Sequence, residues 1–436
     1  MIFHLIGKKI IAALLTWEAR AVLKKYQPKI VAVTGSVGKT STKDAIYTVF
    51  SKHFRVRRSV KSYNSELGLP LTIIGCETAW LNPFGWLKNL LEGISLILFS
   101  TPYPEWLILE LGVDRPGDIK RLASWLRVDV AVITRLPDLP VHVEFFSSAE
   151  ALAAEKLLLL ETLKPQGVAI LNYDDERSRE TAMRLPVSGK LLSYGFADGA
   201  TVRASNIHIT YEAIGGYKFP NGTTFKINYV GNTVPMRLKG IIGEHQLYGI
   251  LAAATAGLAV DINLVDINRA LEEFSYPAGR MKLIPGIKNT LIIDDSYNSS
   301  PAALESALKT LGSLEISGRK IAVLGDMLEL GQYTIDAHRQ AGLQAAAAAQ
   351  LLFTVGIRSK FISDEAAKKL GAKTVEHFYD VAEAGKRLQE LLEPGDVILV
   401  KGSQALRLER VVEEVMAHPE DKKNLLCRQE SEWQRR

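Results

Sequence analysis

The run TGSVGKTST at residues 34–42 constrains the fold of this 436-residue chain more than any other feature, because of the segments that flank it. Residues 30–33 are apolar and mostly β-branched, which is typical of a buried strand. Residues 43–54 place Ala45, Ile46 and Val49 at helical spacing. A strand, a glycine turn and a helix in succession aim free backbone N–H groups and the positive helix end at one point. The run therefore predicts an anion-binding loop.

The side chains of this run suit the phosphates of a nucleotide. Gly35 and Gly38 lack the Cβ atoms that would block a phosphate, Lys39 can bridge terminal phosphates, and the Thr40 hydroxyl can ligate Mg²⁺. The match to the usual P-loop pattern is incomplete, because Val33 stands where that pattern has its first glycine. A chance turn of this composition is the alternative, and the flanking strand and helix favour phosphate binding.

Strand-like and helix-like segments alternate after this loop. Apolar runs at 106–112 and 128–136 predict strands, separated by a helix at 117–127. A helix at 149–163 and a strand at 167–172 come next in the chain. We therefore expect an α/β fold in which a mostly parallel sheet carries the loop.

The pattern changes between residues 201 and 240, where polar and apolar residues alternate and turns recur. This predicts an antiparallel insertion at the edge of the same domain. Beyond a linker at 276–280, four further strand-like runs predict a second, doubly wound α/β domain of Rossmann type; they lie at 290–297, 320–327, 351–356 and 396–402. The expected division is an amino-terminal amphipathic helical segment at 1–29, an ATP-binding domain at 30–278, a carboxy-terminal domain at 279–418 and a polar tail at 419–436.

Composition excludes several classes of protein. Hydrophobic residues make up 47% of the chain and charged residues 23%, as in ordinary globular proteins. The net charge of +5 is small and its basic residues are scattered, so we expect no nucleic-acid partner. Cys76 and Cys427 are the only cysteines and lack metal-ligand spacing, which argues against a disulfide framework or zinc site and fits a reducing cytoplasm.

The amino-terminal segment mixes apolar and basic residues. Its unbroken apolar run, 10–15, is too short to span a bilayer, and Glu18 and Arg20 interrupt the next few positions. One interpretation is an amphipathic helix that contacts a membrane surface or a partner subunit. Its apolar side would carry Phe3, Ile6, Ile10 and Leu14, and its basic residues would be Lys8, Lys9, Lys24 and Lys25. The interpretation that we favour is a helix packed on the ATP-binding domain.

Three residues near the carboxyl ends of predicted strands are candidates for metal binding or catalysis, because such sites collect there in open α/β sheets. Glu110 ends one strand, His142 lies after the next, and Lys156 lies in the helix after that. A solvated acid, a structural histidine and a surface lysine are the alternatives. The residues alone leave both interpretations open.

A set of motifs, in order along the chain, resembles the Mur ligase family of peptidoglycan synthesis. The motifs are TGSVGKTS, LELGVDRPGDI, HVEFFSS, AEKLLLLETLKPQGVAILNYDD, PAGRM, IDDSYNSSP, AVLGDMLELG and VKGSQALRLE. The resemblance extends from about residue 30 to 416, and IDDSYNSSP and LGDMLELG point to the branch of the family that adds a dipeptide.

The resemblance implies roles for particular residues. The ATP phosphates and a first Mg²⁺ would be held by Gly35, Ser36, Gly38, Lys39, Thr40 and Ser41, with Glu110 as a further metal ligand. A second Mg²⁺ would be bound by His142 and by Lys156, which is carbamylated in the family. ATP would be approached by Gln246 near the base and, from the carboxy-terminal domain, by Arg280, Asp295, Tyr297 and Asn298. The amine substrate would lie near Asn298, Lys401 and Ser403. The catalytic residues would be Lys39, His142, Lys156 and Arg280.

The implied reaction joins an acid to an amine. ATP would phosphorylate the carboxylate of a muramyl-peptide-like acceptor, and a D-alanyl-D-alanine-like amine would attack the acyl phosphate. Two departures from the family pattern stand out. Only about 28 residues precede the first strand, so we expect the UDP-sugar site to be missing or replaced; and Gln246 and Gly249 stand where the family has asparagines. The alternatives are a ligase for another acid, of the folylpolyglutamate or poly-amino-acid kind, and a non-catalytic, nucleotide-switched binding subunit.

Overall fold

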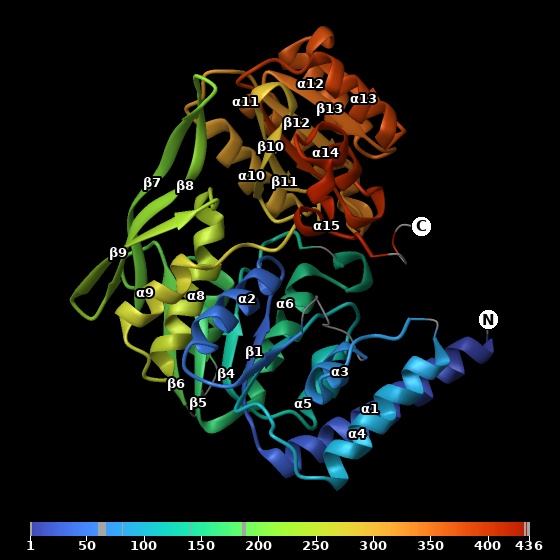
Figure 1. Cartoon of the computed structure of the whole chain (residues 1–436), viewed down its shortest axis with the longest axis vertical. Coiled ribbons are helices and arrows are strands. Elements are labelled where there is room, and N and C mark those ends of the chain that lie inside the picture. The colour runs from blue at the N-terminus through green and yellow to red at the C-terminus, as the bar shows by residue number, and fades with distance from the viewer. Residues whose placement is uncertain are drawn as a thin grey trace.

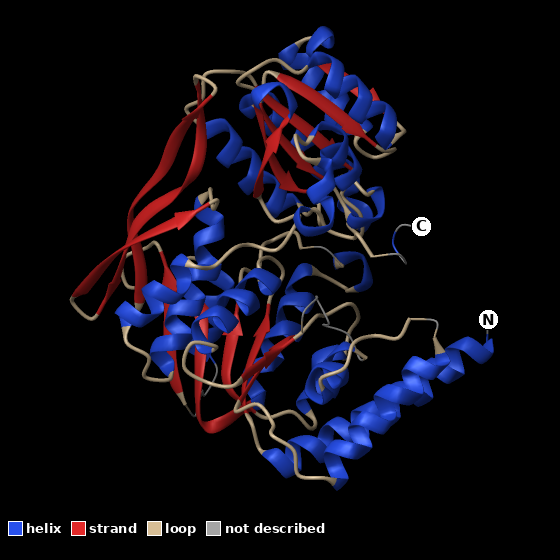
Figure 2. Cartoon of the chain, in the orientation of Figure 1, coloured by secondary structure: helices blue, strands red, loops and turns tan. Residues whose placement is uncertain are grey.

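Two sheets, each covered by helices, make up the molecule (Figures 1 and 2). The computed structural model describes residues 2–59, 67–80, 82–140, 142–184, 189–430 and 433. The first sheet has nine strands in the order β2-β3-β1-β4-β5-β6-β7-β8-β9, and the second has six in the order β10-β11-β15-β12-β13-β14. This confirms the predicted α/β architecture with two sheets.

The first six strands of the larger sheet are parallel. They are β1 (Lys29–Thr34), β2 (Val56–Arg58), β3 (Trp106–Glu110), β4 (Val128–Ile133), β5 (Leu163–Asn172) and β6 (Lys190–Gly195). The sheet continues through β7 (Val202–Ile214), β8 (Tyr217–Tyr229) and β9 (Asn232–Lys239), of which β8 and β9 pair antiparallel. The antiparallel insertion predicted at 201–240 is therefore confirmed as the edge of this sheet.

One predicted boundary is wrong. The helix expected at 149–163 is α6 (Ala149–Leu157) followed by a 3₁₀ helix at Leu158–Thr162, and β5 starts at Leu163 rather than at 167. Pro165 cannot donate to a sheet ladder, and it stands where the pairing of β4 with β5 shifts register between Val128 and Val130. A bulge thus accommodates a residue whose type usually breaks a strand.

Both faces of the parallel strands are buried, which explains their continuous apolar sequences. Val31 and Val33 of β1 face α2 (Lys39–Phe50), α8 (Glu244–Ala259) and α9 (Leu264–Glu272). Ile30 and Ala32 face the opposite layer. That layer contains α1 (Ile2–Tyr26), α3 (Gly68–Ile74), α4 (Pro83–Leu98), α5 (Asp118–Ala123) and α6, and α7 (Glu176–Arg184) comes after β5. The loops that end these strands emerge toward the second sheet (Figure 1).

The second sheet contains all four strands predicted from the sequence, and two more. The predicted strands are β11 (Thr290–Asp295), β12 (Lys320–Gly325), β13 (Leu351–Val355) and β15 (Val397–Lys401). The sequence prediction missed β10 (Lys282–Gly286), an antiparallel edge strand with a proline, and β14 (Val375–Phe378), which is short and polar. The helices around this sheet are α10 (Pro301–Ser313), α11 (Thr334–Ala348), α12 (Lys360–Leu370), α13 (Val381–Leu391), α14 (Glu409–Val415) and α15 (Lys422–Leu425).

Part of the segment predicted as a polar tail, 419–436, is packed. Leu426, Cys427 and Arg428 are buried. The Arg428 guanidinium pairs with Glu409 and donates to the Ser296 carbonyl oxygen at 2.9 Å. A buried arginine requires such partners, and here they belong to α14 and to the loop after β11. The segment that contains Arg428 therefore holds the loop of the IDDSYNSSP motif in place.

The β7–β8 hairpin reaches from the first sheet to the second domain (Figure 1). Phe219 of β8 is 1% exposed and lies in the core cluster of the second sheet, together with Ile242. The backbone N–H of Lys218 donates to Ser317 Oγ at 3.2 Å, and the N–H of Glu315 donates to the Tyr211 hydroxyl at 3.0 Å. The hairpin thus ties the two domains together.

Replacing Phe219 by alanine is expected to destabilise both domains together. The substitution removes a ring buried between them and leaves a cavity, which typically costs about 3–5 kcal/mol. Denaturant unfolding measured by fluorescence would give the loss. Ile214→Ala, at an exposed position of the same hairpin, is the control and should cost little. Equal effects of the two substitutions would show that Phe219 does not join the cores.

Helix α1 packs on the rest of the first domain, as the favoured interpretation predicts. Leu15, Ala19 and Val22 are fully buried against α3, α4 and the sheet. Ile10 and Leu14 are exposed, whereas the side chains of Phe3, Ile6, Lys8 and Lys9, also named in the membrane interpretation, lie outside the described residues. Among the helices that the structure describes, none is long and apolar enough to cross a bilayer.

Glu18 gives the packing of α1 a pH dependence. Its side chain is 2% exposed, and burial raises the pKa of this carboxyl from 4.5 to about 7. Between these pH values the unfolded chain releases the proton while the folded chain keeps it, so stability falls as pH rises and stays reduced above pH 7. Glu18→Gln should therefore raise stability at pH 8, on the order of 1–3 kcal/mol after solvent screening, and leave it unchanged at pH 4. Thermal melting at both pH values tests this, and an equal gain at both would contradict it.

Candidate active site

The P-loop links β1 to α2 and has the backbone geometry of an anion site. Gly38 has φ 86° at the start of α2, and a Cβ there would meet no atom within 4 Å, so the space in front of the helix is open. Gly35 has φ 142°, and a Cβ there would lie 1.9 Å from Thr134 Oγ1. Position 35 thus requires glycine because a side chain would clash with Thr134 just after β4. Position 38 favours glycine because its backbone is left-handed.

Thr40 and Glu110 meet at the mouth of this loop because β1 and β3 are neighbours. The Thr40 hydroxyl donates to Glu110 Oε1 at 3.1 Å. The buried Glu110 Oε2 has no hydrogen-bond partner among the described residues, and Lys43 Nζ lies 3.8 Å from it. Oxygen donors of this kind are the ligands that Mg²⁺ prefers, so the pair fits the predicted metal site. Lys43 was missed in the sequence, where it resembles an ordinary helix residue.

Two lysines lie on opposite sides of the loop. Lys39 Nζ donates to the Gly35 carbonyl oxygen at 2.9 Å, and Lys156 Nζ donates to Ser36 Oγ at 2.8 Å. Burial lowers the pKa of Lys156 well below its usual value, and the charge of Lys39 lowers it further. Burial also lowers the pKa of Lys39, an effect that Glu110 opposes and the charge of Arg280 reinforces. Basic side chains thus crowd around the loop: the charge of Arg280 acts on Lys39, and that of Lys39 acts on Lys156, an arrangement that a bound polyanion would stabilise.

His142 stands at the contact between the domains. Its backbone is left-handed (φ 67°), and Nδ1 lies 2.7 Å from Glu329 Oε2 of the second domain. Its Nε2 lies 3.8 Å from Asp114 Oδ1. The hydrogen bond from His142 lowers the pKa of the Glu329 carboxyl. Asp114 and Glu329 were not singled out as site residues, although both lie inside quoted motifs, in loops after strands.

Within the described part of the chain, no three His, Cys, Asp or Glu side chains are grouped so that they could hold a metal ion by themselves. Any divalent ion beside His142 therefore needs ligand atoms from another source.

The predicted residues of the second domain gather at the ends of β11 and β15. Asp295 and Lys401 are register partners, and Lys401 Nζ lies 2.6 Å from Asp295 Oδ2 and donates to the Asn298 carbonyl oxygen at 2.9 Å. The Arg280 guanidinium lies 4.2 Å from the centre of the Tyr297 ring. These five residues come from the linker and from two neighbouring strand ends.

Ser403 connects this group to the contact at His142. Its Oγ accepts a hydrogen bond from the Leu328 N–H at 2.9 Å, and Glu329 is the next residue in the chain. The hydroxyl thus orients the loop that brings Glu329 to His142. The structure places Ser403 in support of this loop.

A small cavity lies between the P-loop and α8. Its lining includes Gly38, Ser41, Gln246, Gly249 and Tyr276. The Tyr276 hydroxyl donates to the Gln246 carbonyl oxygen, and Gln246 Nε2 lies 3.4 Å from His245 Nε2. Burial, with the charges of Lys401 and Arg135, lowers the pKa of His245 to about 3, so its imidazole is neutral. An aromatic ring, an amide and a neutral imidazole beside the loop suit a nucleobase. His245 was missed in the sequence.

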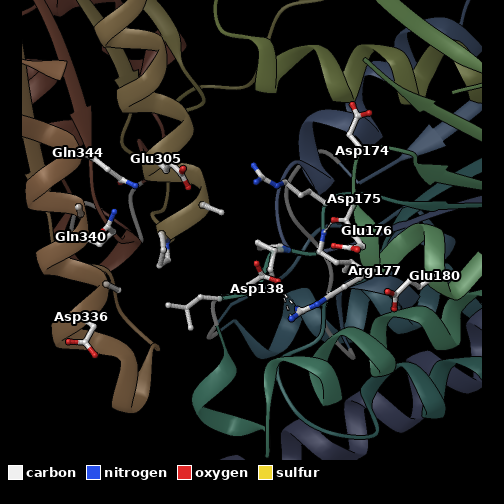
Figure 3. A pocket seen from close by; sticks show the side chains of 18 residues that line it. Asp138, Asp174, Asp175, Glu176, Arg177, Glu180, Glu305, Asp336, Gln340 and Gln344 are labelled. Carbon is white, nitrogen blue, oxygen red and sulfur yellow. Dashed lines mark hydrogen bonds and ion pairs between the residues drawn. The ribbon is translucent and has the colours of Figure 1, made fainter. Parts of the chain in front are cut away.

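A larger cleft of about 770 Å³ separates the two domains and shares Arg135 with this cavity. Glu305 of α10 and Gln340 and Gln344 of α11 face Asp174 to Glu180 across it (Figure 3). Carboxylates outnumber the two arginines along its walls. The cleft leaves room for a second substrate next to the nucleotide cavity.

A P-loop domain joined to a second α/β domain across such a cleft defines a class of nucleotide-dependent enzymes, and sequence comparison identifies which. The Mur ligase middle domain matches residues 33–81 and 89–257, and the Mur ligase glutamate ligase domain matches residues 279–404. The chain therefore belongs to the Mur ligase family, which confirms the resemblance expected from its motifs.

Within the family the chain is similar to ligases that add a dipeptide. It is 29% identical over 404 residues to the UDP-N-acetylmuramoyl-tripeptide–D-alanyl-D-alanine ligase of Bacillus subtilis, covering 92% of this chain and 79% of that protein. MurF from Acinetobacter baumannii matches with a TM-score of 0.75 and 24% identity, over 93% of this chain and 80% of that one. MurF from Thermotoga maritima, solved in complex with ADP, matches with a TM-score of 0.73 and 24% identity, over 93% and 83%. The fold is that of these ligases.

Proposed function

We propose that this chain is an ATP-dependent ligase of the MurF type. It activates the carboxylate of a muramyl-tripeptide-like acceptor and joins it to the amine of D-alanyl-D-alanine, releasing ADP and phosphate in the cytoplasm, where ATP is made. The observation that carries the proposal is the grouping of Lys39, Lys156 and Arg280 around a P-loop that also presents the Thr40–Glu110 pair.

The residues of the loop have separate tasks in this reaction. Backbone N–H groups at the start of α2 bind the phosphates of ATP, while Gln246 contacts the base in the cavity beside Ser41. Lys39 and Arg280 offset the negative charge that develops on the phosphoryl oxygens when the γ-phosphoryl group moves to the acceptor carboxylate. The interdomain contact through His142 and Glu329 limits the access of water to the acyl phosphate.

Two Mg²⁺ ions complete the proposed site. Thr40 and Glu110, whose oxygens already lie together, would hold the first ion, and His142 and a carbamate on Lys156 would hold the second. The ions supply charge neutralisation to the transferring phosphoryl group. Carbamate formation joins a neutral amine to CO₂ with loss of one proton, and the lowered pKa of Lys156 favours that neutral amine.

The second domain presents the amine substrate. Lys401 is held between Asp295 and the Asn298 carbonyl oxygen, and Ser403 fixes the loop before Glu329. The amine of D-alanyl-D-alanine would lie beside Asn298, Lys401 and Ser403, within reach of the acyl phosphate. The acidic side chains of the cleft favour an acceptor peptide with a positively charged side chain, such as the ammonium group of a diamino acid.

Phosphate release with matched substrate pairs tests the proposal. Muramyl tripeptide is offered with and without its UDP group, each with D-alanyl-D-alanine and Mg²⁺, and a folate with glutamate is offered in parallel. Release of phosphate with either muramyl peptide, dependent on the dipeptide and abolished by a chelator, is the expected result. Release with the folate pair alone would identify a ligase for another acid. Nucleotide binding without release for any pair would identify the nucleotide-switched subunit.

A further inference from the structure

Helices α1 and α4 expose a large apolar surface that the proposed reaction does not use. Eight large apolar side chains of this surface, here called the apolar face, are each more than 40% exposed, and Phe84 is 80% exposed. They are Ile10, Leu14, Trp17, Phe84, Leu87, Leu91, Leu98 and Phe99. Soluble monomers seldom expose so many large apolar side chains in one place, and such patches usually mark an interaction surface.

The two helices contribute to the same outer side of the molecule. They run parallel and in contact, because Glu18 lies against Gly93 and Lys25 Nζ donates to the Leu96 carbonyl oxygen at 2.9 Å. Figure 1 shows them side by side along one edge of the first domain. Successive residues of a helix are rotated by about 100°. Measured from the contact between Glu18 and Gly93, this rotation places the apolar stripe of each helix away from the sheet and toward solvent. The stripes therefore form one continuous face.

Spacing along each helix supports this arrangement. Ile10, Leu14 and Trp17 lie four and three residues apart on α1. On α4, Phe84 and Leu91 are seven residues apart, the repeat of one helix stripe. The Glu18 carboxyl, by contrast, is buried between the two helices, beside Gly93, rather than exposed next to the stripe.

The charges around the apolar face are mainly positive. Among the described side chains of residues 10–26 and 82–99, the exposed charged residues are Arg20, Lys24, Lys25, Lys88 and Glu92, four basic and one acidic. Two like-charged copies of this surface would repel each other if they met face to face. An anionic lipid surface complements it, because lipid phosphates pair with the basic rim while large apolar side chains enter the headgroup boundary.

We infer that the apolar face docks the protein on an anionic lipid bilayer. The helices lie in the plane of the membrane surface, with their apolar side chains roughly 5–10 Å below the headgroups and without spanning the bilayer. Trp17 on α1, Phe84 on α4 and Phe99 just after α4 are aromatic residues of the kind that favour this boundary. The inference rests on surface chemistry alone and does not depend on the ligase activity proposed above.

Vesicle flotation of the full chain tests the inference. Vesicles of phosphatidylcholine, alone or mixed with phosphatidylglycerol, are floated with the protein, and binding is expected mainly to the mixed vesicles. The variant Phe84→Ser/Leu91→Ser/Leu98→Ser should lower the partition coefficient at least about tenfold. Arg20→Gln/Lys24→Gln should lower binding to the anionic vesicles and reduce its salt dependence. The matched control is Val230→Ser/Ile357→Ser, which changes two residues that are each 77% exposed elsewhere and should leave flotation unchanged.

The single substitution Phe84→Ser, at the most exposed of these positions, provides a second measurement if the triple variant folds poorly, and should lower partition about threefold. Circular dichroism establishes that each variant is folded. Absence of flotation with both vesicle types would overturn the inference. So would equal loss of binding in the control variant. Concentration-dependent dimers that disappear in the Phe84 variant, without vesicle binding, would assign the face to a second copy instead.

Discussion

Alanine at position 39 is expected to reduce phosphate release to background while leaving the protein folded. The ammonium group of Lys39 lies at the P-loop, hydrogen-bonded to the Gly35 carbonyl oxygen, in the electrostatic field of Glu110 and Arg280. Removal of a group that offsets charge on the transferring phosphoryl oxygens typically costs a factor of about 10²–10³ in rate, and loss of nucleotide binding adds to this. Phosphate release under saturating substrates measures the effect.

The control for Lys39→Ala is Lys52→Ala. Lys52 lies just beyond the end of the same helix, and its ammonium pairs with Glu273 at the surface. Its loss should leave activity unchanged, because exposed ion pairs contribute little. The melting temperatures of both variants should match that of the parent protein. Full ligase activity in Lys39→Ala would refute the role assigned to this residue.

The second large effect is expected at Lys156, where both substitution and removal of CO₂ should abolish activity. Burial and the charge of Lys39 lower the pKa of the Lys156 ammonium well below its usual value, which favours the neutral amine that reacts with CO₂. Lys156→Ala should lower phosphate release by at least about two orders of magnitude, because the carbamate that we propose as a metal ligand could not form. The parent protein in bicarbonate-free, degassed buffer should lose activity and regain it when bicarbonate is added.

Lys164→Ala separates carbamylation from a general loss of lysine charge. Lys164 lies on β5, partly exposed, with its ammonium 2.8 Å from Asp129 Oδ2. This variant should keep the dependence on bicarbonate, whereas Lys156→Ala should show none. Intact-protein mass spectrometry at neutral pH gives an independent measurement: the gain of one CO₂ is expected in the parent and in Lys164→Ala, and not in Lys156→Ala. Activity that is indifferent to bicarbonate would leave Lys156 as a simple cation at the P-loop.

Local features of the chain were sufficient to predict that the glycine loop lies between a strand and a helix and that Glu110 ends a neighbouring strand. The glycine loop, the strand before it and the helix after it are neighbours in sequence, so their geometry depends on a short segment. Glu110 could be predicted because it ends an apolar strand, and parallel strands end at the same edge of a sheet. The resemblance to the family turned Lys156 from one of three open candidates into an expected metal ligand, and it added the second-domain residues, which no local pattern distinguishes from surface residues.

Contacts between distant segments could not be predicted in the same way. Glu329 meets His142 only because the two domains adopt one relative position. The pKa of His245 is lowered by its burial and by the charges of Lys401 and Arg135, which come from distant parts of the chain. Strand β14 is short and polar, so its pairing with β13 rather than its sequence makes it a strand. The burial of Arg428 likewise depends on Glu409, nineteen residues earlier in the chain.

The hairpin formed by β7 and β8 has a consequence for any attempt to divide this protein at the linker near residue 279. The aromatic ring of Phe219 fills part of the core of the second domain, although Phe219 itself belongs to the first domain. Ile242 is in the same core cluster. A fragment that begins at the linker would lack Phe219, so its core would be exposed to water at an apolar cavity that favours aggregation. Because the same ring is buried in the second domain, any change in the relative position of the two domains would have to keep or repack this contact.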